Sequence, residues 1–188
     1  MVGIVLASKS PRRRELLDGL GLRFDVEEPG VEEPAITGDP GAAVAELARA
    51  KGRAVAARRP GILVIAADTA VVVDGVPLAK PADPAENAAF LRRLSGRDHT
   101  VYTGLAVIRD GVESVGCQEA RVTFRDLTRG EVEWYARSGE GLDKAGGYAI
   151  QGRGMALVKA IEGDYACVIG LPVARLVEVL RGFGVELA

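Results

Sequence analysis

The chain has 188 residues, of which 48% are hydrophobic and 27% are charged, and its formal net charge is −2. This size and composition predict one globular domain over residues 1–188 with a sizeable core. The balanced charge excludes the overall positive field that nucleic-acid binding needs. We see no apolar segment of the kind that a signal peptide or a membrane span requires. We therefore expect a cytoplasmic enzyme or binding protein.

The sequence has two cysteines, Cys117 and Cys167, which lie far apart. Their spacing does not match a metal site, because cysteine ligands of a metal usually come in close pairs. We expect two buried thiols in a reducing compartment.

A basic turn follows the first expected strand, residues 2–7. Ser10 fits the N-cap of a helix over 11–20, and Arg12 to Arg14 occupy its first turn. Cations are disfavoured there, because a helix N-terminus already carries partial positive charge. Free N–H groups, the Ser8 hydroxyl and the guanidinium groups together would bind an anion, best of all phosphate. A solvated basic turn is the alternative.

The next segments contain two acidic residues and one unusual lysine. Residues 27–38 form an acidic loop in which Glu32 or Glu33 is either a metal ligand or simply solvated charge, and the second reading is favoured from the loop alone. A helix over 39–59 follows, and Lys51 lies on its apolar stripe. This lysine either extends its amine to water at the edge of the stripe or points a cation into a cleft.

Residues 62–67 predict a buried strand that ends at Asp68 and Thr69. Ligands of open α/β sheets bind beyond the carboxyl ends of the strands. No phosphate-binding loop of the Gly-x-x-x-x-Gly-Lys-Ser/Thr type accompanies this aspartate. Asp68 is therefore a lone carboxylate, suited to holding a divalent cation or to activating water. The alternative is an aspartate that caps a turn.

The middle of the chain combines hairpins with helices, which predicts a mixed twisted sheet with flanking helices, an α/β fold. Lys80 follows the hairpin turn at Asp74 and Gly75, and it either binds a phosphate or is a solvated hairpin end. The expected elements are strands 70–73 and 76–79, a helix over 83–96, strands 101–109 and 112–124, and a helix over 128–139.

A glycine-dense segment, residues 139–154, precedes the last elements. Glycine allows the backbone to approach a ligand closely, and Gln151 has the donor and acceptor that a nucleobase edge requires. A mobile loop with a chance glutamine is the alternative. We interpret the single histidine, His99, as structural. Strands 155–161 and 167–169 and a helix over 172–181 complete the expected elements.

Seven ordered segments over nearly the whole chain resemble the Maf family of nucleoside triphosphate pyrophosphatases. The resemblance implies the α/β fold of inosine triphosphate pyrophosphatases, with two lobes around a cleft. It also implies hydrolysis of a nucleoside triphosphate to the monophosphate and pyrophosphate with a divalent metal ion, Mg, Mn or Co. The segments are Leu6–Leu17, Ala66–Thr69, Lys80–Pro81, Leu94–Arg97, Asp143–Gly146, Ile150–Gly152 and Val168–Pro172.

The same resemblance assigns roles to individual positions. Asp68 matches the catalytic acid–base residue, Lys80 the active-site lysine, and Glu33 a glutamate associated with the metal and with catalysis. Our hypothesis is that Asp68 and Glu33 hold the metal ion.

Phosphate and base contacts follow by the same matching. Arg13 matches the phosphate-binding arginine, and we expect Ser8 and Lys51 to help hold the phosphates. Arg12, Thr69 and Gln151 match the positions that separate subgroups, and this combination resembles the dTTP/UTP pyrophosphatases.

The resemblance leaves one alternative function and implies one assembly. The protein could be a nucleotide-sensing regulator, linked to septum formation in cell division, without significant turnover. We also expect a homodimer, no nucleic-acid partner and no membrane partner.

Overall fold

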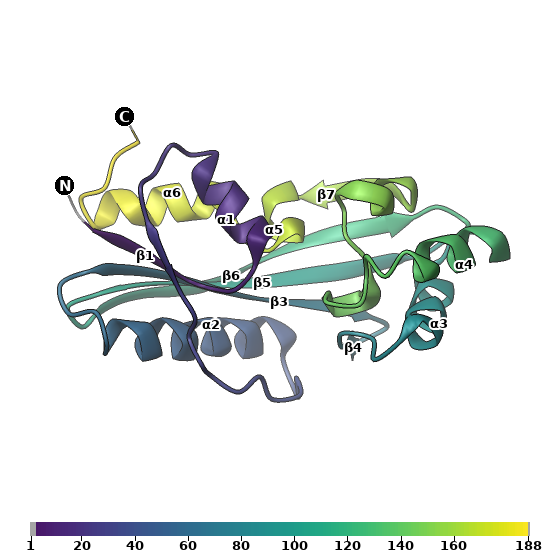
Figure 1. Ribbon diagram of the computed structural model, residues 1–188, viewed down its shortest axis with the longest axis horizontal. Helices are drawn as coiled ribbons and strands as arrows, with labels where there is room; N and C mark the ends of the chain where they lie inside the picture. The colour runs from purple at the N-terminus through teal and green to yellow at the C-terminus, as the bar shows by residue number, and fades with distance from the viewer. Residues whose placement is uncertain (1–2, 188) are drawn as a thin grey trace.

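In the computed structural model, which describes residues 3–187, a seven-stranded mixed sheet carries helices on both faces (Figure 1). The strand order is β2-β1-β3-β5-β6-β7, and β4 pairs with β3. The expected mixed α/β class is therefore confirmed. The strands are β1 (Ile4–Ala7), β2 (Asp25–Glu27), β3 (Leu63–Val73), β4 (Val76–Leu78), β5 (Asp98–Arg109), β6 (Val112–Phe124) and β7 (Val158–Gly163).

The five helices that were expected from the sequence are observed, with bounds within a few residues of the prediction. Ser10, Asp39 and Asp83 each cap a helix through a side-chain oxygen, and a proline follows each of them at the first position. The helices are α1 (Pro11–Asp18), α2 (Pro40–Ala56), α3 (Pro84–Leu94), α4 (Arg129–Arg137), α5 (Tyr165–Ile169) and α6 (Val173–Gly182), with 3-10 helices η1 (Ala145–Gly147) and η2 (Gly152–Ala156).

The sheet has an interruption along one edge of β3. The parallel pairing of β1 with β3 ends at Ala7 and Ala66, and the antiparallel pairing with β4 begins only at Val71. Residues 67–70 of β3 therefore lack a strand partner on this edge, and we call this stretch the notch. The opposite edge of β3 pairs with β5 without a break through the same residues.

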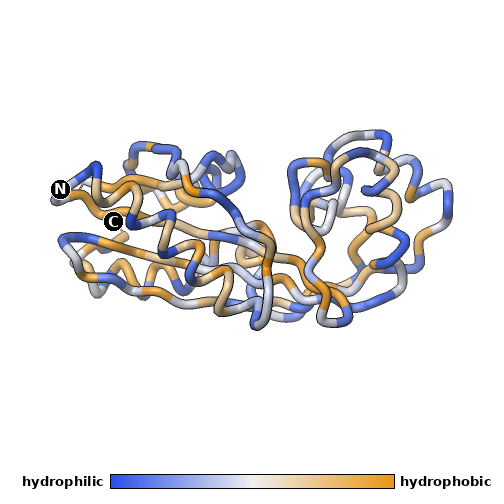
Figure 2. Tube along the Cα trace, turned by 90° about the horizontal axis from the view of Figure 1, so that it is seen from below, coloured by the Kyte–Doolittle hydropathy of each residue, from blue (hydrophilic) through white to orange (hydrophobic). Residues whose placement is uncertain are grey.

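Three apolar clusters form the core. At one end of the long strands, α2 covers one face of the sheet, whereas α1 and α6 cover the other (Figure 1). At the other end, α3 and α4 pack against β3, β5 and β6 around the buried Tyr135 and Phe124. The chain is elongated along the strands, and Figure 2 shows its two groups of elements joined by a narrower middle.

The close fit of α2 on the sheet depends on Gly104 of β5. A Cβ atom at this position would lie 2.1 Å from the carbonyl oxygen of Val44 in α2, so any side chain would force the helix away. The helix consequently lies close enough to the sheet to bury Lys51, which is 5% exposed.

Three expectations about strands need correction. Asp68 does not end a strand, because β3 continues to Val73 through pairing with β5. The apolar residues 167–169 belong to helix α5, which starts where the Asp164 side chain accepts from Ala166 N. The strand expected from 155 begins at Val158, after η2. The first expected strand is confirmed from Ile4, and Val2 lies outside the described residues.

The two cysteine thiols are free. Cys167 is buried as expected, but Cys117 is only half-buried, which corrects the expectation for that residue. Burial raises the pKa of Cys117 to about 11 and that of Cys167 to about 12, so both are poor nucleophiles at neutral pH.

Within residues 3–187, none of the helices has the length and hydropathy that crossing a membrane would require.

Candidate active site

A cavity of about 580 Å³ opens at the notch in the sheet. Successive side chains of a strand point to opposite faces, so Asp68 and Thr69 leave β3 in opposite directions and still reach the same cavity at its free edge. Most of the residues predicted from the sequence line this cavity: Arg12, Arg13, Glu33, Lys51, Asp68, Thr69, Lys80 and Gln151. The structure therefore brings together a set of side chains that are up to 139 positions apart in the chain.

Lys51 joins two carboxylates inside the cavity. Its Nζ donates to Asp68 Oδ1 at 2.7 Å and to Glu33 Oε1 at 2.5 Å. The alternative in which this lysine extends to water is therefore wrong, because its amine points inward and is almost completely buried. Asp68 is 9% exposed, so the two form a pair that water screens only weakly.

Glu33 links this pair to Lys80. Its other oxygen, Oε2, accepts from Lys80 Nζ at 3.2 Å. Partial burial alone raises the pKa of Glu33, but the hydrogen bonds from Lys51 and Lys80 outweigh it and lower the pKa to about 2. Glu33 is thus an anion at neutral pH. Of the two glutamates, Glu32 and Glu33, only Glu33 lines the cavity.

Arg13 forms the opposite side of the cavity floor. Its Nε donates to Gly170 O at 2.7 Å, and its two terminal nitrogens donate to Ser8 Oγ at 3.2 Å and Thr69 Oγ1 at 3.0 Å. Burial lowers the pKa of Arg13, an effect that Asp68 opposes, yet a guanidinium stays charged at neutral pH. Ser8 is itself buried and does not line the cavity, so it holds Arg13 in place from behind.

Thr69 belongs to a directed chain of hydrogen bonds. Thr103 Oγ1 must donate to the carbonyl oxygen of Cys167, at 2.8 Å, because a carbonyl only accepts. The Thr69 hydroxyl therefore donates to Thr103, at 3.0 Å, and accepts from Arg13. Thr103 is fully buried and was not predicted, since nothing in the sequence distinguishes its position from that of any inward-facing strand residue.

The glycine-dense segment forms the remaining wall, and Gln151 lines the cavity there. Gly154 is required for its fold, because a Cβ atom would lie 1.7 Å from the carbonyl oxygen of Ala149. Asn87 of α3 donates from Nδ2 to Gly147 O at 2.6 Å. Tyr135 and Glu140 hold the segment from α4 and the turn after it. Sequence reasoning missed these three supporting residues, and the density of glycine was the only signal of close packing.

His99 is structural in the sense that the sequence predicted. It is 3% exposed, and its ring makes edge-to-face contacts with Phe124 and Tyr148. Its Nε2 is 2.7 Å from the Tyr148 hydroxyl, and Tyr148 lines the cavity. Burial lowers the pKa of His99 to about 4, so the ring is neutral at pH 7.

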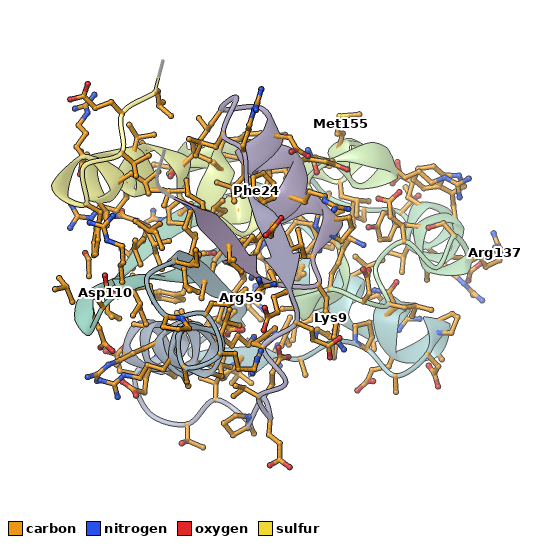
Figure 3. The ribbon with its side chains drawn as sticks, turned by 60° about the vertical axis from the view of Figure 1, so that its left-hand side comes forward. Lys9, Phe24, Arg59, Asp110, Arg137 and Met155 are labelled. Carbon is orange, nitrogen blue, oxygen red and sulfur yellow. The ribbon has the colours of Figure 1, made fainter. Side chains whose placement is uncertain are left out.

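The side chains of the cavity contrast with those of the outer surface. Figure 3 shows Asp110, at the turn between β5 and β6, and Arg137, at the end of α4, on opposite sides of the molecule. These outer charges are exposed to solvent, whereas the cations of the cavity line one shared space.

The metal-binding capacity of the site is limited to two carboxylates. Among residues 3–187, no three His, Cys, Asp or Glu side chains come together as a metal site. Asp68 and Glu33 nevertheless both contact the same cation, the Lys51 ammonium. These two carboxylates could contribute oxygens to a hard cation, which would need further oxygens from a ligand or water.

Known proteins resemble this chain over most of its length. A family model described as Maf-like protein matches residues 3–183. A protein of Deinococcus radiodurans named dTTP/UTP pyrophosphatase is 56% identical, with 97% of this chain and 94% of the relative aligned. One of Symbiobacterium thermophilum with the same name is 50% identical, with 98% and 95% aligned.

A solved structure has a weaker likeness. It is described as a nucleoside-triphosphatase or dITP/XTP pyrophosphatase from Mycobacterium abscessus, with 17% identity, a TM-score of 0.47 and full coverage of both chains.

Proposed function

The chain belongs to the Maf-like protein family, and from this premise we propose that it hydrolyses dTTP and UTP to the nucleoside monophosphate and pyrophosphate. The names of the relatives support this substrate class. In the reaction, the oxygen of water bonds to the α-phosphorus, and the bond from that phosphorus to the bridging oxygen breaks. Pyrophosphate leaves with the bridging oxygen. Modified pyrimidine nucleoside triphosphates are further candidate substrates.

The observation that carries the proposal is that several cationic side chains and a pair of carboxylates line the same cavity. Arg12, Arg13 and Lys80 line the cavity and present positive charge to a triphosphate. Each charge-assisted hydrogen bond from such a group contributes about 1.5–3 kcal/mol. The Asp68 and Glu33 pair lies among them, bound to Lys51.

Asp68 is the residue we propose as general base. Lys51 donates to its Oδ1, which leaves Oδ2 available to accept a proton from the attacking water. In this scheme Lys51 and Lys80 orient the carboxylates and then bind phosphate oxygens. Lys80 is 57% exposed at its side chain and can move toward a ligand without breaking core contacts.

A divalent cation, Mg, Mn or Co, fits the donor set of Asp68 and Glu33, because such ions prefer carboxylate oxygens and complete their coordination with phosphates and water. When bound, the ion would neutralise phosphate charge and polarise the scissile bond.

Thr69 and Gln151 are the groups we propose for contact with the pyrimidine. With its proton directed to Thr103, the Thr69 hydroxyl can only accept from a ligand, as from the N3–H of uracil or thymine. The Gln151 amide supplies both a donor and an acceptor.

A homodimer and a cytoplasmic location stay predictions. Light scattering after size-exclusion chromatography would check the oligomeric state.

The decisive experiment measures pyrophosphate release from dTTP and UTP with magnesium or manganese, together with the other natural and modified nucleotides. We expect release of one pyrophosphate per monophosphate, with dTTP and UTP as the best substrates. Tight nucleotide binding without release would overturn the proposal and favour the nucleotide-sensing regulator.

A further inference from the structure

We propose that Glu140 and Tyr135 are positioning residues that fix the base-facing wall of the cavity and thereby its nucleotide selectivity. Neither residue lines the cavity. Tyr135 precedes the glycine-dense segment and Glu140 lies at its start, and the side chains of both bind backbone groups farther along it. The inference rests on the proposed function, because it concerns how the same cavity distinguishes nucleotides.

The Glu140 carboxylate accepts three hydrogen bonds, one from the Tyr135 hydroxyl and two from backbone N–H groups of the wall. Its Oε1 accepts from Tyr135 Oη at 3.1 Å and from Gly154 N at 3.0 Å, and its Oε2 accepts from Arg153 N at 3.1 Å. These contacts hold the backbone directly after Gln151. A charged acceptor makes such bonds roughly twice as strong as a neutral one does.

Tyr135 holds the other end of the same stretch. Its hydroxyl accepts from Ala149 N at 2.9 Å, and its single proton goes to Glu140. Tyr135 is fully buried in the core beside α3, so its ring cannot follow a moving loop. The stretch that includes Ile150 and Gln151 is therefore anchored on both sides, at Ala149 and at 153–154.

Glu140 also anchors a second segment that lines the cavity. Its backbone carbonyl accepts from Lys144 Nζ at 2.5 Å, and the Lys144 side chain is only 13% exposed. Asp143 and Ala145, on either side of that lysine, line the cavity. One residue thus holds two parts of the wall with its side chain and its carbonyl.

The anchoring matters because the wall is intrinsically loose. Gly146, Gly147 and Gly152 adopt positive φ angles of 72°, 73° and 64°. Glycine loses more backbone freedom on ordering than any other residue does, so these conformations need contacts to hold them. Without the hydrogen bonds to Glu140 and Tyr135, the Gln151 amide would sample several positions and bind no single base edge well.

The test compares Glu140→Gln and Tyr135→Phe with the wild-type protein. For each, kcat and KM are measured separately with UTP, dTTP and CTP, and Tm is recorded. We expect KM for UTP to rise roughly tenfold in Glu140→Gln, which is about 1.4 kcal/mol. The preference for UTP over CTP should narrow, and kcat should change little because Asp68, Glu33 and Lys51 are untouched.

Glu131→Gln is the matched control. Glu131 belongs to the capping box at the start of α4 and contacts no residue of the wall. This variant should lower Tm and leave KM and the preference between nucleotides unchanged.

Three results would overturn the inference. One is a fall in Tm of Glu140→Gln with KM and nucleotide preference unaltered, since this would show a merely structural role. If Glu140→Gln does not fold, Tyr135→Phe is measured instead, and an unchanged KM with an unchanged nucleotide preference in that variant contradicts the inference. If the wild-type protein releases no pyrophosphate, the proposed function fails, and the Kd for UTP then tests the inference alone. An equal Kd in wild type and Glu140→Gln would contradict it.

Discussion

The cavity has two walls that are built in different ways. One wall consists of side-chain charges from α1, α2, β3 and the segment that carries Glu33, and in it Lys51 contacts both Asp68 and Glu33. The other consists of glycine-rich backbone, held in place from behind by Tyr135 and Glu140. The charged wall carries its chemistry on the surface of the cavity, whereas the backbone wall owes its shape to residues that no ligand touches.

This difference indicates how each wall should respond to substitution. A change in the charged wall alters the groups that meet the phosphates and water, and it should show up mainly in turnover. A change behind the backbone wall alters geometry, and it should show up in affinity, selectivity and stability. Each of the following predictions tests one side of this division.

The largest effect is expected for Asp68→Asn in the charged wall. Asparagine keeps the size of the side chain and removes the base, so kcat should fall by roughly 10²–10⁴-fold. Isothermal titration should still detect nucleotide binding. Asp74→Asn, at the exposed hairpin turn beside Arg97, is the matched control and should retain activity. Near-normal pyrophosphate release by Asp68→Asn would remove the proposed base from the mechanism.

The second prediction is that the protein loses stability at acidic pH because of His99, which contacts Tyr148 of the backbone wall. The pKa of His99 is about 4 in the fold, against about 6.5 when unfolded. The unfolded chain therefore binds a proton first as the pH falls, and stability is lost between pH 6.5 and 4. The loss reaches about 3 kcal/mol at the lower limit.

Urea unfolding at several pH values would measure this loss. His99→Gln cannot titrate, so its stability should depend less on pH over the same interval than that of the wild type. Identical pH dependences of the two proteins would show that the ring does not carry the effect.

A smaller change in stability is expected for Thr103→Val. Valine has nearly the shape of threonine but leaves the proton of the Thr69 hydroxyl without an acceptor. It also removes one of the two hydrogen bonds to the Cys167 carbonyl, which keeps the bond from Gly170 N. We expect the free energy of unfolding to fall by about 1–3 kcal/mol. Thr103→Ser keeps the hydroxyl and should lose less of this hydrogen-bond contribution. Equal stability of Thr103→Val and the wild type would contradict the directed chain.

The smallest effect is expected for Lys80→Gln. Lys80 is more than half exposed, so water screens its attraction to phosphate. KM for UTP should rise by at most roughly tenfold, and Tm should stay unchanged. Lys159→Gln, on the exposed side of β7, is the control for loss of one positive charge and should leave KM unchanged.

The two walls also differ in what the sequence reveals of them. Lys51 could be found because a charge stands on an apolar helical stripe, and Asp68 because a carboxylate follows a run of apolar strand residues. Both signals come from local periodicity, which a single sequence shows. The sequence also indicated a mixed α/β sheet, since hairpin turns and helix caps are local features.

The backbone wall had a weaker signal, the density of glycine in residues 139–154, which did not reveal the residues that support it. Glu140 binds groups nearby in the chain, but no local pattern predicts which of them a carboxylate will reach. Thr103 acquires its role only when residues distant in the chain meet, at Thr69 and Cys167. The course of β3 through Asp68 was missed for the same reason, because pairing with β5 overrides a local pattern that suggested an end. Helix α5 was misread because a short apolar run fits a strand as well as a helix.

The unbroken course of β3 and β5 past the notch limits how the molecule can adapt to a ligand. A pair of long hydrogen-bonded strands resists bending, so the two groups of elements at their ends are fixed on a common rigid frame. Adjustment around a nucleotide would then fall to the connecting segments at the rim, above all residues 28–39, which have no regular structure. The protein would then close over its ligand by rearranging residues 28–39, without a hinge motion between the two groups of elements.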